Sequence, residues 1–88
     1  MRVIYKYPLT WDNTQILKLP AGSQIVSVQP QNGKITVWAS VDTSVKELAE
    51  YRIKVYMTGQ RIEDASLIFL NTCVIGDFVF HVCIVPEE

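Results

Sequence analysis

Hydrophobic and polar residues alternate with a period of two along most of the chain, and the alternation is clearest in residues 25–42. The dipeptide Asn32-Gly33 interrupts that segment and supplies the two positive-φ residues that a type I′ turn requires. A two-residue loop pairs Gln31 with Lys34. The pattern therefore predicts a β-hairpin, and the other elements are placed relative to it.

The register of this hairpin separates an apolar face from a mixed one. Val28 lies opposite Val37 in this register. Two residues further on, Val26 lies opposite Ala39. The apolar face carries Val26, Val28, Pro30, Ile35, Val37 and Ala39. The mixed face carries Ile25, Ser27, Gln29, Thr36, Trp38 and Ser40. Such a mixture is typical of a solvated or partner-facing surface, on which the Trp38 indole needs a partner to cover it.

The remaining segments predict further short strands separated by turns. These strands are expected at residues 1–7, 15–19, 51–57 and 67–73 and from residue 78 onward. The last one is apolar on both faces, which predicts a central strand or an interface. Pro30 falls in a non-hydrogen-bonded pair, which predicts a sheet edge or a strand end on that side. Residues 44–50 fit either a helix of about two turns or a strand.

The fold class predicted from these elements is mainly β. We expect one domain, residues 1–88, that forms a small antiparallel β-sandwich or partly open barrel of about six or seven strands, with at most one short helix. A hydrophobic fraction of 49% is high for so short a chain. A single small core cannot bury all of it, so a homo-oligomer is expected.

Charge and hydropathy exclude several classes of partner. A net charge of −1 gives no electrostatic basis for binding long nucleic acids or an anionic membrane. No secretory leader is recognisable, and no apolar run reaches the ~18 residues that a membrane span needs. The expected location is the cytoplasm, and no membrane partner is predicted.

The residues that could carry catalysis do not form a recognisable set. Cys73 and Cys83 match no zinc or redox spacing and are expected to be small buried hydrophobes in a reducing compartment. His81 is the only histidine, and Cys83 stands two residues away on the same strand face, about 6–7 Å distant and beyond hydrogen-bond reach. Glu63 and Asp64 are expected on a solvated surface. We therefore predict a non-enzymatic protein without a metal or cofactor.

Aromatic side chains interleaved with cations are the more suggestive feature. The set comprises Tyr5, Tyr7, Trp11, Trp38, Tyr51 and Tyr56, with Arg2, Lys6, Arg52 and Lys54. Stacking platforms beside cations can recognise a base and its phosphate. The alternative is that these are ordinary amphipathic strand residues with snorkelling cations beside them. The ligand-binding candidates are Trp38, Tyr5, Arg2, Lys6 and Arg52.

Several stretches together resemble a family of small uncharacterised proteins found mainly in bacteriophages and prophages. They are Val3-Ile4-Tyr5-Lys6-Tyr7-Pro8-Leu9, Leu19-Pro20-Ala21-Gly22, Ile25-Val26-Ser27-Val28-Gln29, Asn32-Gly33, Val37-Trp38-Ala39, Val41-Asp42, Thr58-Gly59 and Phe80-His81-Val82. The resemblance implies a protein that acts in the cytoplasm of a bacterial host. It also implies inhibition of a host enzyme or defence system.

Two functions fit this expectation. The first is sequestration of a small signalling nucleotide, with Trp38 or Tyr5 stacking on a base and Arg2, Lys6 or Arg52 facing phosphates. The second is inhibition of a host or CRISPR-type defence protein, which would dock on the mixed hairpin face or on an exposed strand edge. A nucleotide needs a concave pocket, whereas a protein inhibitor can use a flat patch.

Overall fold

The computed structural model describes residues 1–86, which form seven strands and no helix. The strands are β1 (Arg2–Pro8), β2 (Thr14–Pro20), β3 (Gln24–Gln31), β4 (Lys34–Asp42), β5 (Leu48–Met57), β6 (Ile68–Ile75) and β7 (Phe78–Val85). The predicted mainly-β fold is therefore confirmed. Within residues 1–86 there is no helix long and apolar enough to cross a membrane.

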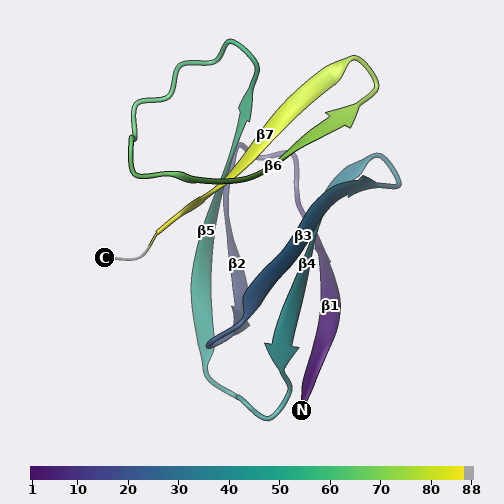
Figure 1. Ribbon diagram of the computed structural model, residues 1–88, viewed down its shortest axis with the longest axis vertical. Coiled ribbons are helices and arrows are strands. Elements are labelled where there is room, and N and C mark those ends of the chain that lie inside the picture. Colours follow the sequence, from purple (N-terminus) through teal and green to yellow (C-terminus); the bar gives the residue numbers. More distant parts are fainter. Residues whose placement is uncertain (87–88) are drawn as a thin grey trace.

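The strands form two antiparallel sheets that pack as a small sandwich (Figure 1). The three-stranded sheet has the order β1-β4-β3, and the four-stranded sheet has the order β2-β5-β7-β6. The sandwich does not close into a barrel. The edge strands β3 and β6 approach each other, since the Asn71 side-chain amide donates a hydrogen bond to the Val28 carbonyl.

The central hairpin folds at the predicted turn. Asn32 and Gly33 have φ values of 53° and 74°, which fit a type I′ turn. Gln31 pairs with Lys34, and Val28 pairs with Val37, as the pattern predicts. The hairpin register near the turn is confirmed.

The register changes at Val26, where the prediction is wrong. A shift between Ile25 and Ser27 pairs Ile25 with Ala39 and leaves Val26 in a β-bulge. Ile25 packs against the core, whereas Val26 is 54% exposed. A bulge adds one residue to one strand and so reverses the side-chain alternation beyond it. Because Ile25 and Val26 are both apolar, the sequence pattern did not reveal the reversal.

Prolines mark three of the four sheet edges. The Leu9 N–H donates to the Ile35 carbonyl at 2.8 Å, so Leu9 faces β4 and the preceding Pro8 faces the open edge of β1. Pro20 in β2 and Pro30 in β3 also lie on edge strands. A residue without an N–H is tolerated there because no neighbouring strand needs its hydrogen bond. The edge position predicted from Pro30 is confirmed.

The core lies between the two sheets. Its buried hydrophobic residues are Leu9, Leu19, Val28, Ile35, Val37, Ala39, Val41, Ile53, Cys73 and Val82. Strand β7 contributes one buried face to it and pairs with β5 and β6 on its two sides, so the predicted central strand is confirmed. Residues 44–50 contain no helix, and β5 begins at Leu48 after a turn.

That turn is held by Asp42 rather than by a helix cap. The Ser44 N–H and hydroxyl donate to Asp42 Oδ1 at 3.0 and 2.6 Å, and the amino group of Met1 donates to the same oxygen at 3.3 Å. These hydrogen bonds lower the pKa of Asp42 to about 2. An Asx turn therefore competes successfully with helix initiation at Thr43 and Ser44.

Candidate functional site

The outward surface of the three-stranded sheet brings together three of the predicted binding residues. We call this surface the Trp38 face, and its members are Arg2, Ile4, Lys6, Val26, Ser27, Thr36, Trp38 and Ser40. Trp38 lies half-buried on the central strand, with Lys6 opposite it on β1 and Ser27 opposite it on β3. Ile4 is 59% exposed, and the bulged Val26 is 54% exposed. Trp38 therefore has Lys6 and Ser27 as its cross-strand neighbours, and two accessible aliphatic side chains share the same face.

Both cations of the Trp38 face lie across the central strand. Arg2 Nε donates to the Ser40 hydroxyl at 3.1 Å, and Arg2 Nη2 donates to the Ser40 carbonyl at 3.0 Å. Lys6 Nζ donates to Gln31 Oε1 at 2.9 Å. The Lys6 methylene chain therefore passes over Thr36, which is only 1% exposed. These contacts hold the Arg2 and Lys6 side chains flat against the sheet.

No cavity described in the structure opens on the Trp38 face. Three cavities are described for residues 1–86, and none is lined by a residue of the Trp38 face; two lie near the loop after β5 and one lies near Gly22 and Pro86. A flat surface with an aromatic centre is typical of protein interfaces, whereas small ligands bind in concave sites.

Two predicted binding residues lie away from Trp38. Tyr5 pairs with Ala39, so it belongs to the opposite side of the three-stranded sheet. Arg52 lies on β5 in the other sheet, where it pairs with Ile16 and Val85. The structure therefore brings Trp38, Arg2 and Lys6 together but does not bring Tyr5 or Arg52 to them.

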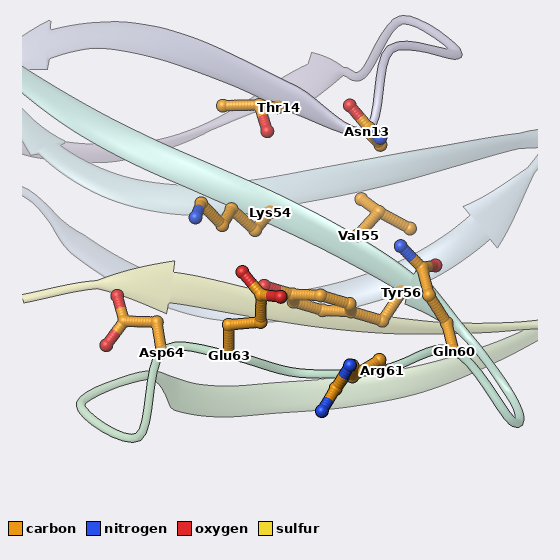
Figure 2. A pocket seen from close by; sticks show the side chains of 9 residues that line it. All are labelled: Asn13, Thr14, Lys54, Val55, Tyr56, Gln60, Arg61, Glu63 and Asp64. Atoms are coloured by element: carbon orange, nitrogen blue, oxygen red, sulfur yellow. The ribbon is translucent and has the colours of Figure 1, made fainter.

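A groove lies beside β5, and we call it the Tyr56 groove (Figure 2). Its volume is about 470 Å³. Lys54 and Tyr56 reach it from the outward side of β5, and the loop of residues 58–67 forms the opposite wall (Figure 2). The lining residues are Asn13, Thr14, Lys54, Val55, Tyr56, Gln60, Arg61, Glu63 and Asp64.

The charges of the Tyr56 groove balance. Lys54 and Arg61 carry positive charge, and Glu63 and Asp64 carry negative charge. Asp64 Oδ1 accepts hydrogen bonds from the Ser66 N–H at 2.8 Å and from the Ser66 hydroxyl at 2.6 Å. These bonds, with a smaller contribution from the Lys54 charge, lower the pKa of Asp64. Asp64 is therefore ionised at neutral pH and anchors the loop.

A smaller apolar cavity adjoins the groove, and we call it the Trp11 pocket. Its volume is about 220 Å³, and its lining includes Trp11, Met57 and Phe80. The Trp11 and Phe80 rings lie 5.6 Å apart between centroids and are tilted by 48°. Both cavities are lined by Asn13, Val55 and Gln60, so they meet at the end of β5.

The histidine and both cysteines contact neighbouring polar groups. Thr58 Oγ1 and Thr72 Oγ1 each lie 2.9 Å from a ring nitrogen of His81. Cys83 contacts the His81 carbonyl rather than the imidazole, with its sulfur 3.9 Å from that oxygen. Both thiols are buried, and burial raises the pKa of Cys73 and of Cys83. In residues 1–86 no group of three or more His, Cys, Asp or Glu side chains is arranged to hold a metal ion.

The sequence pattern does not predict the Tyr56 groove, although it marks several of its lining residues as aromatic, cationic or acidic candidates. Lys54, Tyr56 and Trp11 belong to the aromatic and cationic set, whereas Glu63 and Asp64 were expected on a solvated surface. The sequence pattern does not indicate that residues 58–67 pack beside β5, which is what forms the groove (Figure 1). The length of this connection was the available signal, because long connections in small domains are commonly functional.

A family model described as a domain of unknown function, DUF7352, matches residues 1–88. The chain belongs to this family. The match covers the whole sandwich, including both the Trp38 face and the Tyr56 groove. No curated protein matches the chain, and no solved structure matches it.

Proposed function

We propose that the protein is a non-enzymatic inhibitor that binds a partner protein through the Trp38 face. The supporting observation is that Trp38 lies half-buried at the centre of a flat surface, between the exposed side chains of Ile4 and Val26. Tryptophan and arginine at the centre of a patch are the residues that most often dominate binding energy. The resemblance to small phage proteins favours a host defence protein in the bacterial cytoplasm as the partner.

The state of the cations also favours a protein partner. Arg2 and Lys6 already donate hydrogen bonds within the sheet, so a phosphate would have to replace these contacts. A protein surface can instead pack on their methylene chains and leave the hydrogen bonds in place. The hydrogen-bonded cations lying flat on the Trp38 face therefore support a protein partner over a phosphate ligand.

Capture from the cytosol of a bacterial host tests this proposal. Immobilised wild-type protein, Trp38→Ala and Trp11→Ala are compared, and captured proteins are identified by mass spectrometry. We expect one partner to be retained by wild type and by Trp11→Ala but lost with folded Trp38→Ala, which removes an aromatic anchor worth about 2 kcal/mol or more. Equal capture by all three proteins would contradict the proposal.

Sequestration of a small nucleotide is the second candidate, and one observation favours it. Lys6 lies directly opposite Trp38 in the register, so a stacking ring and a cation are neighbours. A second copy packed on this face would convert it into a pocket, and the exposed hydrophobic side chains favour such an oligomer. Titration of cyclic dinucleotides into Trp11→Phe, in which Trp38 is the remaining tryptophan, tests this candidate. Unchanged Trp38 emission, together with a monomer by light scattering, would eliminate it.

A further inference from the structure

We infer that the Tyr56 groove and the Trp11 pocket together bind a small zwitterion with a flat apolar side chain, the class to which aromatic amino acids belong. This site is separate from the Trp38 face. The groove lies beside β5 of the four-stranded sheet and the pocket lies at the end of β5, where Ile35 of β4 also lines it; neither is lined by a residue of the Trp38 face. The inference therefore does not depend on the proposed function.

The balance of charge in the groove selects the head group. Lys54 and Arg61 can bind a carboxylate, and the planar guanidinium of Arg61 matches a carboxylate with two parallel hydrogen bonds. Glu63 can bind an ammonium group on the same ligand, since Asp64 is already engaged by Ser66. A ligand that carries both charges satisfies both sides of the groove.

The same balance disfavours a polyanion. A nucleotide phosphate near Lys54 and Arg61 would also lie near the carboxylates of Glu63 and Asp64. Like charges brought together in a partly enclosed site repel, which offsets the attraction of the two cations. The groove is therefore better matched to a net-neutral zwitterion than to a nucleotide.

The Trp11 pocket provides the site for the flat apolar group. The Trp11 ring is 61% exposed, and the tilted Phe80 ring and the Met57 side chain lie beside it. An aromatic ring can pack edge-to-face or offset-stacked against such a pair, and the methionine thioether adapts to its shape. Ring binding would also bury hydrophobic area that the chain alone leaves exposed.

The wall shared by the two cavities is fixed by hydrogen bonds. The Val55 N–H donates to the Asn13 carbonyl at 2.9 Å, and the Met57 N–H donates to Gln60 Oε1 at 3.0 Å. The second bond orients the Gln60 amide so that its NH₂ group remains available to a ligand. The Gln60 amide is thus already oriented where the two cavities meet, and it can donate a hydrogen bond to a ligand that spans them.

Fluorescence titration with L-phenylalanine tests this inference. In Trp38→Phe the remaining tryptophan is Trp11, so its emission reports the pocket directly. We expect L-phenylalanine to change the emission saturably. Phenethylamine lacks the carboxylate and 3-phenylpropionate lacks the ammonium group, so each should bind about tenfold more weakly or worse.

Charge variants assign the head group. Arg61→Gln should weaken L-phenylalanine binding about tenfold and leave phenethylamine binding unchanged. Glu63→Gln should show the reverse preference, weakening L-phenylalanine while leaving 3-phenylpropionate unchanged. Arg52→Gln is the matched control, because Arg52 is an exposed cation of β5 that does not line the groove, and this variant should bind like the parent.

Three results would overturn the inference. One is no response of Trp11 to L-phenylalanine up to about 10 mM, a concentration beyond the usual range of specific sites. Another is equal affinity for L-phenylalanine and both of its analogues, which would mean a simple apolar pocket without a zwitterion site. The third is tighter binding of AMP than of L-phenylalanine, which would mean a phosphate site.

Discussion

The outward surfaces of the two sheets differ, although both sheets are built from short antiparallel strands. The three-stranded sheet is left bare, and Lys6 and Arg2 lie flat across it. The four-stranded sheet is accompanied by the loop of residues 58–67, which turns its surface beside β5 into the Tyr56 groove (Figures 1 and 2).

The connections explain this difference. Strands β3 and β4 are joined by the two-residue turn at Asn32-Gly33, which leaves no chain to cover the sheet. Strands β5 and β6 are separated in the sheet by β7, so their connection must pass across it. One surface therefore carries side chains that lie flat on the sheet, and the other carries the Tyr56 groove; the proposals of a protein partner for the first and of a small ligand for the second rest on this difference.

The largest expected effect lies in the core that both sheets share. Ile53 is fully buried between the sheets, whereas the adjacent Arg52 is exposed. We expect Ile53→Ala to lower the free energy of unfolding by about 2–5 kcal/mol through lost burial and a residual cavity, and Arg52→Ala to change it by less than about 0.5 kcal/mol. Urea unfolding followed by circular dichroism measures both. Similar losses would show that β5 does not separate an inner from an outer surface.

The tight turn of the bare sheet gives the next largest effect. Gly33 has a φ of 74°, a conformation that a β-branched residue strongly disfavours. Gly33→Val should cost about 1–3 kcal/mol. Thermal unfolding of this variant, with Lys34→Val as a control at a strand position, measures the cost. An unchanged melting temperature would place the turn elsewhere.

Acid should lower the folding stability of the protein through the Asx turns formed by Asp42 and Asp64. The pKa of Asp42 is lowered from 3.8 to about 2, and that of Asp64 is also lowered. A lowered pKa in the folded state means that the ionised carboxylate stabilises the protein above pH about 4 and that this contribution is lost as the pH falls toward 2. Asp42→Asn should therefore flatten the loss of stability over that interval. Parallel curves for this variant and wild type would exclude Asp42 as a source of the acid sensitivity.

The smallest expected effect is a difference in reaction rate between the two buried thiols. Cys73 lies in the core between the sheets, and Cys83 lies on the outward side of β7, between Lys54 and Phe69 in register. Local opening of the 58–67 loop should expose Cys83 without global unfolding. We expect Cys83 to react with iodoacetamide faster than Cys73, as measured by mass spectrometry over time. Equal rates would mean that both thiols are exposed by the same opening.

The local fold could be predicted from the sequence where one signal dominates. Asn32-Gly33 predicts the hairpin and its register near the turn, because few residues adopt a positive φ. Pro30 predicts an edge strand, because proline has no N–H to donate to a neighbouring strand. The bulge at Val26 could not be predicted, since a one-residue shift between two apolar residues leaves the pattern unchanged.

The candidate sites were only partly predictable for a related reason. Arg2, Lys6 and Trp38 lie together because β1 pairs with β4, and Tyr5 is excluded by the alternation along the same strand. The Tyr56 groove depends on the path of residues 58–67, which have no periodic pattern and therefore carry no signal of where they pack.

The most direct test of the account is the free energy of unfolding of Trp38→Ala compared with that of Val37→Ala. These adjacent residues face opposite sides of β4, with Val37 fully buried and Trp38 on the outward surface. We predict a loss of about 1–3 kcal/mol for Val37→Ala and of about 1 kcal/mol or less for Trp38→Ala, although the second substitution removes many more atoms. A larger loss for Trp38→Ala than for Val37→Ala would show that the Trp38 face is core, and it would contradict the proposal that this face is a recognition surface.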